Sequence, residues 1–267
     1  MLATRSGTLV PVTAGPTGLV PGGLGVPDRA ALAPILAGWS ALPGGHRAAA
    51  IDLRAWHTAA TAVDLRIPAA TRAGVTAAQL AELDRGLPDP PSGGTGFASA
   101  QRAAELTRKA LEARSARLDE CVAATVGAGI GTTPAGDDVI CGVLAGLDLL
   151  GKTGAHGRLG AAVTPLLTAT TRTSRHLLAA AVAGRYTEGL IGLAGALASA
   201  SAPAVREALG VLRRWGASSG LDQATGLAAA IRAGTLTALP RCARSAAPGR
   251  AVTLVRSLRS LTQAGAR

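Results

Sequence analysis

The stretch GAGIGTTPAGDDVICGVLAG, residues 127–146, carries the residues best suited to chemistry in this 267-residue chain. Thr133 followed by Pro134 is typical of a helix start, with the threonine as N-cap and the proline at the first helical position. The surrounding glycines allow a tight turn and a close approach of a ligand to the backbone. Exposed N–H groups and the positive end of the helix dipole then form an anion site. We therefore expect substrate to contact Gly129, Gly131, Thr132, Thr133 and Gly136.

Two adjacent aspartates, Asp137 and Asp138, occupy the first turns of that predicted helix. A single aspartate there would be an ordinary first-turn acid stabilised by the helix dipole. Two favour a catalytic role, because adjacent residues diverge by about 100° around a helix and both cannot cap it. We predict that both are catalytic, with one carboxylate acting as a base or through a cation and the pair orienting the substrate or Mg²⁺. Mg²⁺ would relieve the repulsion between a carboxylate and an anionic substrate, but the sequence identifies neither a metal-ligand set nor a required cofactor.

A second stretch, GASSGLDQATGLAAAI at residues 216–231, repeats this design. Both stretches contain Gly-x-Asp-x-x-x-Gly at the start of an apolar helix, and Asp222 takes the place of Asp138. Two such helix starts would face each other across one pocket, with the two carboxylates on opposite walls. The alternative is that each is simply a well-capped helix. On the first interpretation, the far wall of the substrate site consists of Ser218, Ser219, Gly220 and Asp222.

Between the two copies, the segment TATTRTSRHLL at residues 168–178 begins another predicted helix. Thr173 and Ser174 offer hydroxyl groups, and Arg175 offers a guanidinium for a carboxylate, so we add these three residues to the substrate site. His176 precedes an apolar run and is more typical of a packed helix histidine than of a catalyst. The other histidines lie in separate segments without metal-ligand spacing.

The spacing of the glycines is similar to that of a nucleotide-binding P-loop, but the residues around them do not fit one. In the first stretch, an aspartate stands where a P-loop has its phosphate-binding lysine. Downstream, GLDLLGKT at residues 146–153 fits the P-loop letters, but its Leu-Asp-Leu-Leu continues a helix. We expect Gly151 to end that helix and Lys152 to interact with its negative end.

The amino-acid composition argues against nucleic-acid binding and against membrane association. The formal net charge is +11, but the excess is scattered arginine and aromatic residues are only 2%, so we expect no nucleic-acid partner. No apolar run is long enough for a membrane span and no signal peptide is apparent, which predicts a cytoplasmic protein without a membrane partner. Cys121, Cys141 and Cys242 follow no disulfide or zinc pattern and are expected to be reduced thiols.

The elements that must position these residues predict an α+β protein. A short β-containing N-terminal region, rich in proline and glycine, carries weak strand-like runs at residues 6–12, 49–53 and 62–68. The segment GLPDPPSGGTG, residues 86–96, is the expected junction. Helical periodicity follows, with helices near residues 99–126, 137, 161, 171–178, 187, 203, 221 and 251. We therefore predict an N-terminal region at 1–96 and a mainly α-helical C-terminal domain at 97–267.

The motif Gly129-x-Gly131-x-Thr133-Pro134-x-Gly136-Asp137-Asp138, the Thr/Ser-rich helix start and Ser218-Ser219-Gly220-x-Asp222 together resemble the AllH family. The resemblance covers roughly residues 111–231. Thr132 replaces the leucine usual before Thr-Pro, and the N-terminal third is short and weakly patterned. The resemblance implies a subunit of the catabolic oxamate carbamoyltransferase of allantoin and purine breakdown, in which oxalurate and phosphate yield oxamate and carbamoyl phosphate.

Two functions follow from this resemblance. The first is a carbamoyltransferase subunit that binds a small anionic metabolite at the glycine-rich helix starts and works with AllF-like and AllG-like subunits. The second is a non-catalytic subunit that binds a small anion or assists assembly, and that needs partner proteins for chemistry. Both fit the residues, since helix N-termini bind anions and arginines bind carboxylates.

Overall fold

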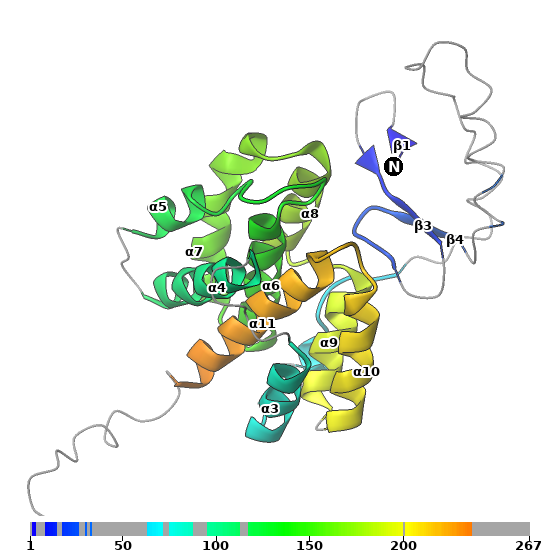
Figure 1. The fold of residues 1–267 in the computed structure, drawn as a ribbon. Helices are drawn as coiled ribbons and strands as arrows, with labels where there is room; N and C mark the ends of the chain where they lie inside the picture. Colours follow the sequence, from blue (N-terminus) through cyan, green and yellow to red (C-terminus); the bar gives the residue numbers. More distant parts are fainter. Residues whose placement is uncertain are drawn as a thin grey trace, which may run out of the picture. The chain divides into compact units, whose positions relative to one another are not determined.

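A computed structural model gives the fold (Figure 1). It describes residues 2–3, 9–14, 18–26, 30, 33, 63–71, 75–87, 95–112, 117–199 and 201–236. By internal contacts the chain divides into two compact units, Met1–Gly234 and Thr235–Arg267. The boundary expected at residue 96 stays a prediction.

Two small sheets lie in the N-terminal region. β1 (Leu2–Ala3) pairs antiparallel with β2 (Leu9–Val10), and β3 (Val12–Ala14) pairs in parallel with β4 (Leu24–Val26). The α+β class is thus confirmed. The strand predicted at 62–68 is wrong where it is described: residues 63–68 form no strand, because Leu65 and Ile67 are buried against helices and the Leu65 carbonyl accepts the Tyr186 amide. The run at 49–53 lies outside the described residues.

Helices make up most of the rest of the described chain. In order they are η1 (Ala69–Thr71), α3 (Ala77–Gly86), α4 (Thr95–Leu111), α5 (Leu118–Ala123), α6 (Ala135–Leu149), α7 (Thr153–Val163), η2 (Thr164–Ala169), α8 (Arg172–Val182), α9 (Glu188–Ala198), α10 (Ala202–Arg213) and α11 (Ser219–Leu236). The predicted helical segments from 99 to 221 are confirmed, although the first is divided into α4 and α5. The helix predicted near 251 and Cys242 lie outside the described residues.

Helix α6 is the centre of the fold, because it is apolar on every side and packs against α4, α7, α8 and α9. It ends as predicted at Gly151, whose φ is +65°. The Lys152 amide donates to the Leu147 carbonyl and the Gly151 amide to the Asp148 carbonyl, which is the Schellman arrangement that satisfies the last carbonyls of a helix. The P-loop-like letters therefore belong to a helix end.

Helices α6 and α11 cross with their backbones in contact. A side-chain carbon placed on Gly142 would lie 2.0 Å from the Gln223 carbonyl oxygen, and one on Gly226 would lie 2.2 Å from the Val139 carbonyl oxygen. Val139 and Gln223 each stand three residues before the glycine of their own helix, so the contact is reciprocal. Only glycine fits at either position. This crossing fixes the two helix starts relative to each other.

Candidate functional site

The loop before α6 combines exposed backbone with unusual dihedral angles. Gly127, Gly129 and Gly131 have φ of 73°, 122° and 100°, in the region that favours glycine. Residues 129–132 are exposed, whereas Gly136 is buried with its amide donating to the Ala128 carbonyl. The loop therefore presents its glycine backbone to solvent immediately before the positive end of α6.

Thr133 does not cap α6, so that expectation was wrong. The N-cap is Pro134, with ψ of 140°, and its carbonyl accepts the amides of Asp137 and Asp138. The helix begins one residue later than predicted, which frees the Thr133 hydroxyl for a contact outside its own helix. It lies 2.8 Å from the Ser219 hydroxyl.

Asp137 is buried and both of its carboxylate oxygens are hydrogen-bonded. Oδ1 accepts the Gly127 amide at 2.8 Å, and Oδ2 accepts the Thr170 hydroxyl at 2.5 Å and the Ser174 hydroxyl at 2.6 Å. These bonds tie the start of the loop and the start of α8 to α6. Thr171 adds a further tie through its hydroxyl, which donates to the Thr132 carbonyl at 2.5 Å. Asp137 thus fixes the shape of the loop.

Asp138 has a different environment, although its side chain is equally buried, with 1% exposed. Its Oδ1 accepts the Gln223 side-chain amide at 3.0 Å, while Oδ2 has no hydrogen bond of good geometry. Burial raises the pKa of Asp138 to about 7; hydrogen bonding from Gln223, Ser219 and Thr133 opposes this shift and the Asp222 charge adds to it. A carboxyl in this setting can take up or release a proton near neutral pH.

The second predicted helix start lies against the first. The Thr133–Ser219 contact joins the two starts, and the Gln223–Asp138 hydrogen bond joins the same two helices one turn further on. Asp222 is buried, and burial raises the pKa of its carboxyl against hydrogen bonding from Ser99 and Ser218. Gly220 packs against the Leu212 carbonyl, so only glycine fits there. The structure therefore brings Thr133 and Asp138 of the first start next to Ser219 and Gln223 of the second.

The three residues predicted on α8 separate into different roles. Ser174 belongs to the Asp137 cluster. The Arg175 guanidinium donates from Nε to the Leu167 carbonyl at 2.7 Å, so in this structure it holds the end of η2. Thr173 is half-buried on the same helix. The His176 ring nitrogen Nε2 lies 2.5 Å from the Pro21 carbonyl, which is the packing role expected of it.

Sequence reasoning missed four residues at these contacts: Gln223, Thr187, Thr170 and Ser99. Gln223 links the Thr187 hydroxyl, at 3.1 Å, to Asp138. Thr170 donates to Asp137, and Ser99 is near Asp222, where it opposes the rise in the pKa of that carboxyl. The position of Gln223 next to Asp222 in the repeated motif is the only sequence signal for it, since glutamine is also common on exposed helix faces.

No group of three or more His, Cys, Asp or Glu side chains gathers into a metal site within the described residues. Magnesium binding at the aspartates therefore stays a hypothesis, and the roles proposed below do not depend on it. Cys121 and Cys141 are free thiols.

Comparison with known proteins gives one family. Residues 125–231 match the model of the family described as oxamate carbamoyltransferase subunit AllH. The resemblance drawn from the motifs is thus confirmed over this segment, which holds every predicted site residue from Gly129 to Asp222. Neither the curated proteins nor the solved structures include a significant match. Among the described helices of this AllH-matching chain, none is long and apolar enough to cross a membrane.

Proposed function

We propose that this protein is an AllH-like subunit of a carbamoyltransferase and binds a small anionic metabolite at the joined starts of α6 and α11. The observation that carries the proposal is the buried Asp138 carboxyl between two glycine-rich helix starts, inside the segment that matches the family. Two helix ends with positive dipoles favour an anion, and the exposed loop at residues 129–132 gives it access to backbone amides. The fitting substrates are oxalurate and phosphate or, in reverse, oxamate and carbamoyl phosphate.

The proposed reaction requires the transfer of a proton to the leaving group. In the direction of breakdown, a phosphate oxygen bonds to the carbamoyl carbon of oxalurate, the carbon–nitrogen bond breaks, and the departing oxamate nitrogen takes a proton. Asp138 would supply that proton, because its pKa of about 7 keeps a proton available at neutral pH. It would then regain the proton that the attacking hydrogen phosphate loses as its oxygen bonds to the carbamoyl carbon. The hydroxyls of Ser219 and Thr133 contact each other at 2.8 Å and both act on the Asp138 carboxyl, so they would pass the proton on.

The remaining predicted residues would act through position. The Gly129, Gly131 and Thr132 backbone would hold the anion, as donors placed around a developing negative charge lower the barrier of acyl transfer. Asp137 would keep the loop in this shape through its bonds to Gly127 and Ser174. Ser218 and Asp222 would form the far wall. The pathway that we propose for this site is purine or allantoin nitrogen breakdown, as the resemblance to the AllH family implies.

The alternative is a subunit that binds the anion without performing chemistry. The family description favours it in one respect, because it names a subunit, and the reaction centre can lie with partners such as AllF-like and AllG-like proteins. In this case Asp138 would only set the affinity for the anion.

The test is an assay of the purified chain with oxamate and carbamoyl phosphate, first alone and then with candidate AllF-like and AllG-like subunits. We expect phosphate release that depends on oxamate and on the partner subunits, and that Asp138→Asn abolishes. Folding of the variant is checked by circular dichroism. Oxamate-dependent turnover that survives Asp138→Asn assigns the chemistry elsewhere and supports the alternative. Absence of oxamate-dependent turnover under every combination overturns the substrate assignment.

A further inference from the structure

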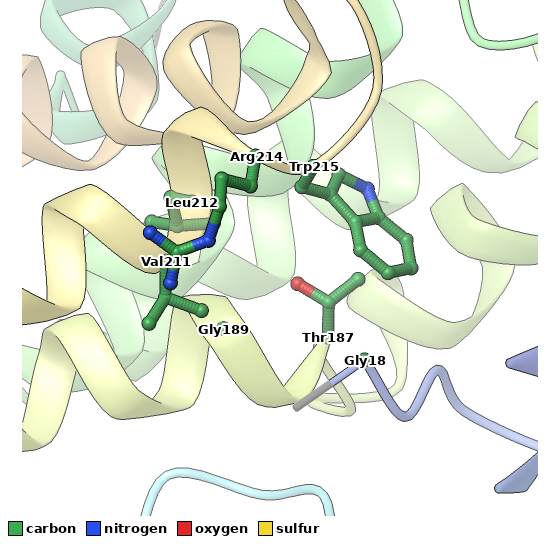
Figure 2. Close-up of a pocket in the computed structure, with 7 residues that line it drawn as sticks. All are labelled: Gly18, Thr187, Gly189, Val211, Leu212, Arg214 and Trp215. Atoms are coloured by element: carbon green, nitrogen blue, oxygen red, sulfur yellow. The ribbon is translucent and has the colours of Figure 1, made fainter. Parts of the chain in front are cut away.

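A small pocket lies beside the predicted site, between the start of α9 and the end of α10 (Figure 2). Its volume is about 110 Å³, and it is lined by Gly18, Thr187, Gly189, Val211, Leu212, Arg214 and Trp215. An apolar cavity of about 150 Å³ is large enough for benzene, so this smaller pocket limits an enclosed ligand to about six heavy atoms at most. No residue of the sequence prediction lines it.

The pocket wall offers one cation and one aromatic plane. Arg214 is exposed, and no carboxylate among the described residues forms a salt bridge with its guanidinium. Trp215 is half-buried, and its ring packs beside Gly18. The nearby Glu188 carboxylate already accepts the amides of Gly18 and Leu19 at 2.8 and 3.0 Å, which fixes this wall. A planar, negatively charged ligand would therefore find a guanidinium on one side of the pocket and an indole ring on the other (Figure 2).

Thr187, which lines a third side of the pocket, is connected to Asp138 through Gln223. Thr187 is buried, and although it is the N-cap of α9 its hydroxyl does not cap that helix. The hydroxyl donates instead to Gln223 Oε1 at 3.1 Å, and the amide end of Gln223 donates to Asp138 Oδ1. Two hydrogen bonds thus connect the pocket wall to the carboxyl proposed to carry the proton.

We propose that this pocket binds a small planar carboxylate bearing an amide, with its carboxylate on Arg214, its plane against Trp215 and its polar end toward Thr187. The proposal rests on the proposed function for the choice of oxamate as probe, because oxamate has this chemistry and six heavy atoms. It adds Arg214 and Trp215, which lie outside both glycine-rich starts, to the residues that recognise the substrate.

The experiment follows the fluorescence of Trp215 during a titration with oxamate. Trp39→Phe and Trp56→Phe leave Trp215 as the only tryptophan of the chain, and circular dichroism checks that this double variant folds. We expect a saturable change in emission. In this background Arg214→Gln raises the dissociation constant at least tenfold, because a charge-assisted contact is lost. Arg213→Gln is the matched control, since the neighbouring Arg213 guanidinium donates to the Gly86 carbonyl and does not line the pocket.

Each outcome separates this proposal from the proposed function. Saturable binding that Arg214→Gln weakens and Arg213→Gln leaves unchanged supports the pocket, even if no turnover is found with any partner. Absence of a saturable change up to tens of millimolar oxamate overturns the pocket assignment, as does an equal loss in both arginine variants. If turnover that depends on Asp138 is then still observed, the proposed function stands without this pocket.

Discussion

Replacing Asp138 by asparagine tests whether this buried carboxyl is a functional group or an ordinary helix-start acid. Asparagine has nearly the same shape and keeps an oxygen for the Gln223 side-chain amide, but it cannot ionise. A capping acid stabilises its helix, so its loss costs about 0.5–2 kcal/mol. A carboxyl ionised at the cost of burial has the opposite effect, and its replacement stabilises the protein at high pH.

The magnitude follows from the pKa of Asp138. Its value is about 7 in the folded protein, against an ordinary value of 3.8. Between these values the folded state binds more protons than the unfolded state, so the free energy of unfolding falls as the pH rises through this range and levels off above about pH 7. At about 1.4 kcal/mol per pKa unit, the complete shift corresponds to about 4 kcal/mol. We therefore expect Asp138→Asn to be more stable than the natural chain by about 2–4 kcal/mol at pH 8 and by less than about 1 kcal/mol at pH 4.5.

Urea denaturation followed by circular dichroism at several pH values between 4.5 and 8 measures this difference. Asp137→Asn is the matched control on the adjacent residue. Its carboxylate oxygens accept bonds from Gly127, Thr170 and Ser174, so an amide donor there faces another donor and costs about 1–3 kcal/mol at every pH in the series. An Asp138→Asn variant that is less stable than the natural chain at both ends of the series would refute the reasoning.

Three further outcomes are expected. Gly142→Ala places a methyl group against the Gln223 carbonyl and lowers the free energy of unfolding, measured by urea denaturation, by more than about 3 kcal/mol. The control Gly157→Ala in α7 has open space around it, so it leaves this free energy unchanged or raises it by up to about 1 kcal/mol. Thr187→Val leaves Gln223 Oε1 without its donor and costs about 1–3 kcal/mol in the same measurement. Burial raises the pKa of the Cys141 thiol well above its ordinary value, so a thiol reagent at pH 8 labels it only after denaturation, as mass spectrometry of the labelled peptides will show.

Local sequence signals predicted the helix starts, because glycine, proline and serine restrict the backbone regardless of what packs against it. The pairing of the two copies was also visible, since the glycine four residues after each aspartate is needed for the close crossing of α6 and α11. The N-cap at Thr133 was wrong because Pro134 itself adopts the extended ψ of the N-cap residue, while the Thr133 hydroxyl contacts Ser219 across the fold.

The contacts that distinguish the two aspartates were not predictable from local pattern. Asp137 and Asp138 are adjacent and equally buried. Asp137 accepts donors from Gly127 in its own loop and from Thr170 and Ser174 around the start of α8, whereas Asp138 accepts the side-chain amide of Gln223 on α11. The strand predicted near residue 65 failed for a related reason, because its apolar residues bury themselves against helices instead of a neighbouring strand.

The anchoring of the glycine loop has a consequence for affinity. Its backbone is secured near each end, by Asp137 at Gly127, by Thr171 at Thr132 and by Ser219 at Thr133. Fixing one residue costs about 1–2 kcal/mol of conformational entropy, and here folding has already met that cost. The loop is therefore preorganised for a metabolite, and little of the binding free energy is lost to ordering the chain. When the metabolite dissociates, the loop should keep the same conformation.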